Sequence, residues 1–150
     1  MKLSTKGRYG LRALVDLVIH YEGESVPVST IATRQNISVN YLEQVYGSLR
    51  RAGIVRTIKG AQGGYNLLKD PKEITVADVL QAIEGDLVVV EEEVNESAPL
   101  AVKNMQKCIQ NRVWDQMNES IQKVTREITL DQLATEYLEK NPKEPIMYYI

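Results

Sequence analysis

Polar and basic side chains suited to nucleic-acid contacts are concentrated between residues 37 and 65, ISVNYLEQVYGSLRRAGIVRTIKGAQGGY. Asparagine, glutamine and glutamate can pair with base edges, and arginine can bind guanine or a phosphate. The candidates for base contacts are Asn40, Tyr41, Glu43 and Gln44, with Ser38 just before them. The candidates for phosphate contacts are Lys6, Arg34, Arg50 and Arg51. This pattern predicts a surface that binds duplex DNA.

The base-contacting candidates fall on a predicted helix. Ser38 is a good N-cap residue, and Gly53 stands where a left-handed residue ends many helices. Apolar side chains recur at helical spacing between them, at Leu42, Val45, Tyr46, Leu49 and Ala52. The sequence therefore predicts a helix with one buried stripe and a polar outer face that includes Ser48.

A β-hairpin is predicted directly after this helix. Residues 54–58 and 65–68 have the composition of strands, and Lys59-Gly60-Ala61-Gln62-Gly63-Gly64 connects them. Lys59 and Gly60 are expected to approach a minor groove, where a narrow width concentrates negative potential. The alternative is an ordinary hairpin with a glycine-rich turn.

The elements before and after this unit complete a predicted helix-turn-helix. A first helix is expected from Ser4, with a stripe of Leu11, Leu14, Val15, Val18 and Ile19. Residues 26–28 could form a brief edge strand, and Ser29 is expected to cap a short helix that ends near Asn36. A further helix is expected from Thr75 to Gly85. Residues 1–85 are therefore predicted to form a winged helix-turn-helix domain.

Charge is distributed unevenly along the chain. Residues 1–70 carry a net charge of +5 and residues 71–150 carry −7, within a total of −2. DNA is therefore expected to meet the N-terminal half only. No segment is apolar and long enough to suggest a membrane span or a signal peptide, so we expect a cytoplasmic protein without a membrane partner.

The C-terminal half is predicted to contain a dimerisation helix after a connecting segment at 86–99. Residues 100–128 would form a helix about 43 Å long. Its apolar face consists of Val102, Met105, Ile109, Val113, Met117, Ile121, Val124 and Ile128. The same helix of a second subunit is the expected partner, and packing wholly within one subunit is the alternative. A capping box at Thr129 is expected to open a final helix. After the domain at 1–85 and the connecting segment at 86–99, residues 100–150 are the third predicted region of the chain. The predicted fold is mainly α with a small β-hairpin wing.

Several of these segments resemble the Rrf2 family of bacterial winged-helix regulators. They are the opening MKLSTKGRYG, YLEQ at 41–44, LRRAG at 49–53, Lys59-Gly60, and Gly63-Gly64-Tyr65. The resemblance is specific over residues 1–85, looser beyond them, and nearest to the cysteine-metabolism repressors and iron–sulfur cluster regulators. It implies a homodimeric repressor that binds a palindromic operator. The alternatives are a protein-interaction module and a redox-responsive regulator.

The resemblance also bears on Cys108, the single cysteine of the chain. Cluster-binding relatives carry three cysteines in this region, and residues 108–114 resemble the segment with the last of them. Asn111 stands where those relatives have a histidine. An iron–sulfur cluster needs several thiolates, so we predict no cluster, no metal and no other cofactor. Cys108 is either a redox-sensitive thiol or a small apolar side chain that fills space. Enzymatic activity is not expected, because no pair of catalytic groups is evident.

The C-terminal tail is apolar and ends in Tyr148, Tyr149 and Ile150. It resembles the tail of serine acetyltransferase that enters O-acetylserine sulfhydrylase, and the ends of this family's cysteine-metabolism repressors. The sulfhydrylase is therefore a hypothetical partner that would link regulation to cysteine supply. The alternative is a tail packed against the dimer.

Overall fold

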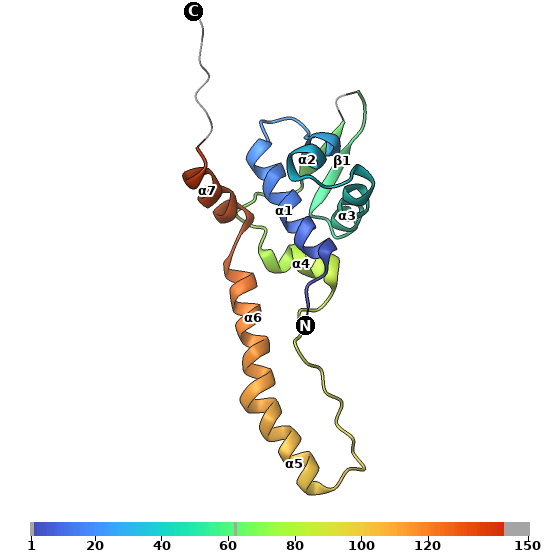
Figure 1. Cartoon of the computed structure of the whole chain (residues 1–150), viewed down its shortest axis with the longest axis vertical. Coiled ribbons are helices and arrows are strands. Elements are labelled where there is room, and N and C mark those ends of the chain that lie inside the picture. The colour runs from blue at the N-terminus through green and yellow to red at the C-terminus, as the bar shows by residue number, and fades with distance from the viewer. Residues whose placement is uncertain (1, 62, 143–150) are drawn as a thin grey trace, which may run out of the picture.

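A computed structural model describes residues 2–61 and 63–142. Figure 1 shows a compact head and a long arm that projects from it. The head comprises residues 2–84 together with the last helix, and the arm comprises residues 86–127. The elements of the head are α1 (Thr5–His20), α2 (Val28–Gln35), α3 (Val39–Arg51), β1 (Val55–Ile58), β2 (Gly64–Leu67), α4 (Val76–Glu84) and α7 (Leu130–Lys140). Those of the arm are α5 (Leu100–Ile109), the π-helical turn η1 (Gln110–Trp114) and α6 (Asp115–Glu127).

Helix α1 runs through the centre of the head and begins where the sequence predicts. The Ser4 hydroxyl accepts a hydrogen bond from the Gly7 amide at 3.1 Å, which caps the helix. Leu14 and Leu17 are fully buried in a core shared with α2 and α3, whose members include Ile31, Leu42 and Leu49. Leu17 was not part of the predicted stripe. The members of that stripe other than Leu14 are partly buried: Leu11, Val15, Val18 and Ile19.

Helix α2 begins two residues earlier than predicted. Its N-cap is Pro27 and not Ser29, because the Pro27 carbonyl already accepts from the amides of Thr30 and Ile31. The expected edge strand is reduced to Val26, which exchanges backbone hydrogen bonds of 3.1 and 2.9 Å with Tyr65. The helix ends at Asn36 in the left-handed conformation, with φ of 55°, as the sequence indicates.

Helix α3 has the two ends that the sequence predicts. The Ser38 hydroxyl accepts from the Tyr41 amide at 3.2 Å. At the other end Gly53 has a φ of 77°, and its amide donates to the Arg50 carbonyl while the Ile54 amide donates to the Leu49 carbonyl. This paired arrangement is a Schellman motif, which turns the chain directly into β1.

The hairpin packs against the segment before α2. Strands β1 and β2 are antiparallel, with Val55 opposite Leu67 and Ile58 opposite Gly64. Strand β1 begins one residue later than predicted and ends where predicted, and β2 both begins and ends one residue earlier than predicted. Gly64 lies so close to the Val26 carbonyl that a Cβ atom there would overlap the backbone. Glycine at this position therefore allows the wing to rest on the head.

Two adjacent capping boxes join the arm to the head. Thr75 and Asp78 form one at the start of α4, and Thr129 and Gln132 form the other at the start of α7. The Val76 amide also donates to the Ile128 carbonyl at 2.8 Å. Both threonines were predicted as helix starts, but only the fold brings them together.

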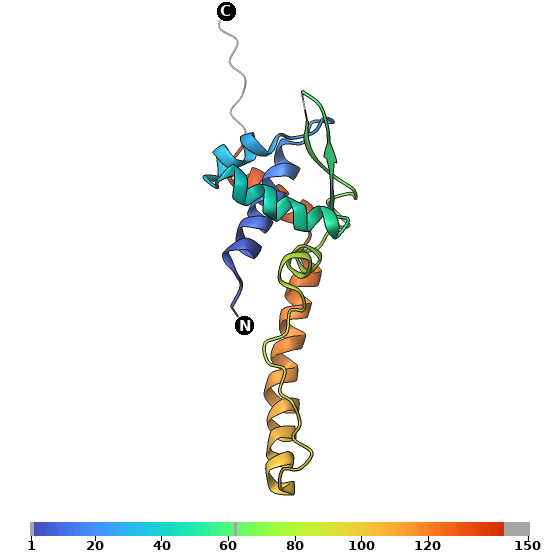
Figure 2. The same ribbon diagram turned by 90° about the vertical axis from the view of Figure 1, so that its right-hand side faces the viewer.

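The arm is one long helix with an extended segment beside it (Figures 1 and 2). Residues 86–99 contain no helix or strand, and the Val89 amide donates to Asn118 Oδ1 at 2.7 Å. The predicted helix over 100–128 is present up to Glu127 and contains the π-turn η1 in its middle. None of the described helices is both long and apolar enough to cross a bilayer.

The π-turn keeps the apolar face of the arm on one side. From Met105 to Ile121 the apolar residues recur at every fourth position. Each such step overshoots a full α-helical turn by about 40°, so four steps would rotate the face by about 160°. A π-turn holds an extra residue, which sets the rotation back by about 100°. We did not predict this π-turn from the sequence, although the four-residue spacing of the apolar side chains is consistent with it.

Candidate nucleic-acid interface

Helix α3 presents a polar surface at the front of the head, with the hairpin beside it (Figure 2). The predicted base-contacting residues Asn40, Glu43 and Gln44 are all exposed. Tyr41 is half-buried, since its ring meets the Tyr9 ring edge-on with the centroids 5.8 Å apart. The structure thus brings these residues together along one helix, and their contact with base edges stays a prediction.

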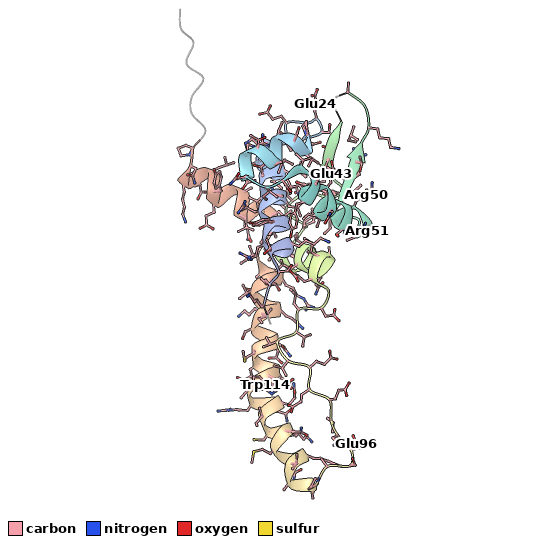
Figure 3. All side chains as sticks on the ribbon, turned by 45° about the vertical axis from the view of Figure 1, so that its right-hand side comes forward. Glu24, Glu43, Arg50, Arg51, Glu96 and Trp114 are labelled. Atoms are coloured by element: carbon pink, nitrogen blue, oxygen red, sulfur yellow. The ribbon has the colours of Figure 1, made fainter. Side chains whose placement is uncertain are left out.

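A cluster of cations lies at the C-terminal end of α3. Lys6 Nζ donates to the Ser48 hydroxyl at 2.9 Å, and Arg51 Nη2 donates to the same oxygen at 3.2 Å. Arg50 is exposed beside them on α3 (Figure 3). Ser48, by contrast, is 8% exposed, although the sequence indicated the outer face for it. Its role in joining Lys6 to Arg51 depends on tertiary contact and had no signal in the sequence.

Arg34 is placed differently from the other predicted phosphate contacts. Its Nε and Nη2 donate to the Asp16 carboxylate, and the shortest of these bonds is 2.7 Å. Gln35 Nε2 donates to the same carboxylate at 2.8 Å, and the Asp16 side chain is fully buried. Arg34 therefore fastens α2 to α1, and a phosphate contact by its remaining N–H groups stays a prediction.

The tip of the wing carries the predicted cation. Lys59 and Gly60 are exposed, and Gly60 has a φ of 118°, a conformation that favours glycine. Arg56 on β1 is a further exposed cation that the sequence analysis did not single out. Alternation along the strand could have indicated it, because Arg56 follows the buried Val55.

The wing also contacts the side of α3 that carries the predicted base-contacting residues. The Tyr65 hydroxyl donates to Glu43 Oε2 at 3.2 Å. Burial raises the pKa of Tyr65, and the neighbouring Glu43 carboxylate raises it further. Tyr65 was predicted as a strand residue and belongs to the Gly63-Gly64-Tyr65 segment, but nothing in the sequence indicated this contact.

The predicted dimerisation face is largely uncovered within one chain. Its residues are between 38% and 63% exposed, except for Ile121 and Ile128, which are partly buried. Those exposed residues are Val102, Met105, Ile109, Val113, Met117 and Val124. Ile121 packs instead against the cluster of Val76, Leu80 and Leu87, where the arm meets the head. Tyr148, Tyr149 and Ile150 lie outside the described residues.

The head contains two short helices, of which the second has an exposed polar face, and then a hairpin with a basic tip. This arrangement defines a winged helix-turn-helix DNA-binding protein. Comparison with known proteins refines this class. The profile of the Rrf2 family, described as an iron-dependent transcriptional regulator, matches residues 3–136. The chain belongs to the Rrf2 family of transcriptional regulators, which is not a family of enzymes.

Individual relatives agree with this assignment over nearly all of the chain. The transcriptional regulator CymR of Bacillus subtilis (strain 168) is 33% identical over 150 residues, which is the full length of both proteins. The solved structure of CymR (YrzC), the global cysteine regulator of B. subtilis, has a TM-score of 0.75 at 34% identity and covers 91% of this chain and 98% of that one. The structure of T. potens IscR has a TM-score of 0.74 at 34% identity, with coverages of 99% and 97%.

The side chains of this protein do not fit an iron–sulfur cluster. Over residues 2–61 and 63–142, no group of three or more His, Cys, Asp or Glu side chains could hold a metal ion. Cys108, the one cysteine, is exposed on the arm, whereas His20, the one histidine, bonds through Nδ1 to the Asp16 carbonyl of α1. A cluster requires more thiolates than one or two copies of this chain supply.

Proposed function

We propose that this protein is a homodimeric repressor that binds a palindromic operator and blocks transcription there. The observation that carries the proposal is the arrangement on one face of the head: base-contacting side chains on α3, cations at its end, and Lys59 on the wing. The Lys6, Arg50 and Arg51 cluster can neutralise phosphates, while Asn40, Glu43 and Gln44 reach base edges.

The exposed apolar row on the arm supports the dimer. Single apolar side chains at a surface need no explanation, but a continuous row along a helix indicates an interface. Two copies joined along this row would present two α3 helices related by a two-fold axis. The operator would then have half-sites about 34 Å apart, or a multiple of that distance.

The experiment is a selection of bound sequences from random duplex DNA, followed by salt titrations of the selected operator. Lys59→Ala is expected to weaken binding to all sequences and to lower the salt slope by about one unit, because one cation that neutralises the phosphates flanking the minor groove is lost. Lys123→Ala, an exposed lysine of the arm, is the matched control and should leave the slope unchanged. Failure of the wild-type protein to enrich any sequence contradicts the proposal.

We further propose that the regulated genes serve cysteine metabolism and that the C-terminal tail binds O-acetylserine sulfhydrylase. The support is the full-length similarity to CymR, whose solved structure is named for global cysteine regulation, and the ending Tyr148-Tyr149-Ile150. A chain shortened by these three residues should lose binding to the sulfhydrylase while it keeps the operator. Equal binding by both forms, or by neither, rejects this partner.

A further inference from the structure

The side chain of Glu43 is held by a residue of the wing. Glu43 is exposed on α3, and a free glutamate at a helix surface samples many rotamers. Here Tyr65, on β2, donates its hydroxyl hydrogen to Glu43 Oε2 across 3.2 Å. Figure 3 shows Glu43 on the part of α3 that lies beside the hairpin. One bond therefore connects the wing with the base-contacting side of the helix.

Tyr65 is itself firmly placed. Its ring stacks on the Tyr46 ring, with the centroids 4.5 Å apart and the planes 18° from parallel. Tyr46 is fully buried and donates to the Ala13 carbonyl of α1 at 3.0 Å. The backbone N–H and C=O groups of Tyr65 both form hydrogen bonds with the backbone of Val26. The phenol oxygen is thus fixed relative to the core of the head. Tyr65 as a whole residue is only 6% exposed.

The wing also contacts the other end of α3. Arg50 Nη1 donates to the Thr57 hydroxyl at 3.4 Å, and Thr57 is the cross-strand partner of Tyr65. The two neighbouring wing residues therefore contact an acidic side chain near the start of α3 and a basic one near its end. Displacement of the wing would move both side chains together.

We propose that Tyr65 is a positioning residue for DNA specificity, whose hydroxyl holds Glu43 in the orientation that accepts a hydrogen bond from a cytosine amino group. A carboxylate repels phosphates but can accept a hydrogen bond from the N4 amino group of cytosine. The orientation of the Glu43 carboxylate therefore decides whether it helps to discriminate between bases. Pre-organisation lowers the entropy lost when the contact forms. The inference rests on the proposed function, because it takes α3 as the base-reading helix.

The test is Tyr65→Phe, which keeps the aromatic stack and the backbone pairs and removes only the hydroxyl. Glu43 stays solvated, so the unfolding midpoint should not change. In selections from random duplex DNA, preference for cytosine at the position read by Glu43 should fall by about 3- to 10-fold, the value of part of a charged hydrogen bond. Tyr137→Phe, an exposed tyrosine of α7, is the matched control and should leave base preferences intact.

A double variant separates positioning from other roles of the hydroxyl. In a Glu43→Ala background, Tyr65→Phe should change neither affinity nor base preference, because the side chain that it positions is gone. A further change in that background, or a uniform loss of affinity for all sequences in the single variant, overturns the inference. If the wild type enriches an operator and Tyr65→Phe enriches it with identical base weights, the inference alone is wrong. If the wild type enriches nothing, the proposed function fails as well.

Discussion

The head and the arm differ in how far they bury their apolar side chains. Every helix of the head contains buried residues, and the core links α1, α2, α3 and the hairpin. Helix α5 and the π-turn η1 contain no buried residue, although both carry apolar side chains. The head therefore buries its apolar side chains within one chain, whereas those of α5 and η1 stay at least partly exposed. This difference is the one expected if the arm is stabilised by association with a second copy, as proposed above.

The largest expected effect tests the arm. Ile109→Glu combined with Met117→Glu places two carboxylates in the exposed apolar row, where an interface would have to desolvate them. We expect the dimer to be weakened by about 4 kcal/mol or more, and the protein to sediment as a monomer with reduced operator affinity. The thermal unfolding of the head should persist, because neither residue contributes to its core.

Arg126→Glu is the control for this variant. Arg126 lies nine residues beyond Met117 in α6, about half a turn away around the helix. It adds negative charge to the same element but on the opposite face, and it should leave the dimer intact. A wild-type protein that is already monomeric at micromolar concentration, or a double variant that remains dimeric, contradicts the assigned function of the arm.

A smaller effect tests the self-sufficiency of the head. The Asp16 carboxylate is fully buried and binds Arg34 and Gln35, so it connects α1 with α2. Asp16→Asn should lower the free energy of unfolding by about 3 kcal/mol, because it leaves Arg34 without its buried anion. Denaturant unfolding of the purified protein measures this loss.

The exposed ion pair of α7 provides the comparison. Lys140 donates to Glu136 at 2.9 Å with both side chains in solvent, and this bond lowers the pKa of the Glu136 carboxyl. Since the pair is screened by water, Glu136→Gln should produce no measurable destabilisation. Equal losses from Asp16→Asn and Glu136→Gln would show that burial does not strengthen the ion pair in the head.

The local features of the fold could be predicted from the sequence. The caps at Ser4, Ser38, Thr75 and Thr129 and the left-handed ends at Asn36 and Gly53 depend on a few neighbouring residues. The short helix begins earlier than predicted because the Pro27 carbonyl accepts from the amides of Thr30 and Ile31, and the fixed φ of proline suits a helix start. The π-turn could be inferred only by adding up the rotation of the apolar face over four steps of the pattern. The residue spacing within two helical turns does not reveal that rotation.

The candidate site was predictable as a face but not as a set of contacts. Helical spacing was enough to place Glu43 and Arg50 on the outer side of α3. The partners of Glu43 and Arg34 lie 22 and 18 residues away, and only tertiary packing brings them into contact. The same holds for Ser48, which polarity suggested to be outside and which packing buries. Single-residue chemistry is thus visible in the sequence, and pairing between distant elements is not.

The smallest expected effect concerns Cys108 on the arm. The residue is exposed, which argues against a space-filling role within one chain. Cys108→Ser should change the free energy of unfolding by less than about 0.5 kcal/mol, as surface substitutions usually do. Mass spectrometry after peroxide treatment, paired with operator titrations, then tests the redox alternative. Loss of DNA binding on oxidation of the wild type but not of Cys108→Ser would make the arm a redox-sensing element. An unmodified thiol with unchanged binding would leave association as the proposed function of the arm.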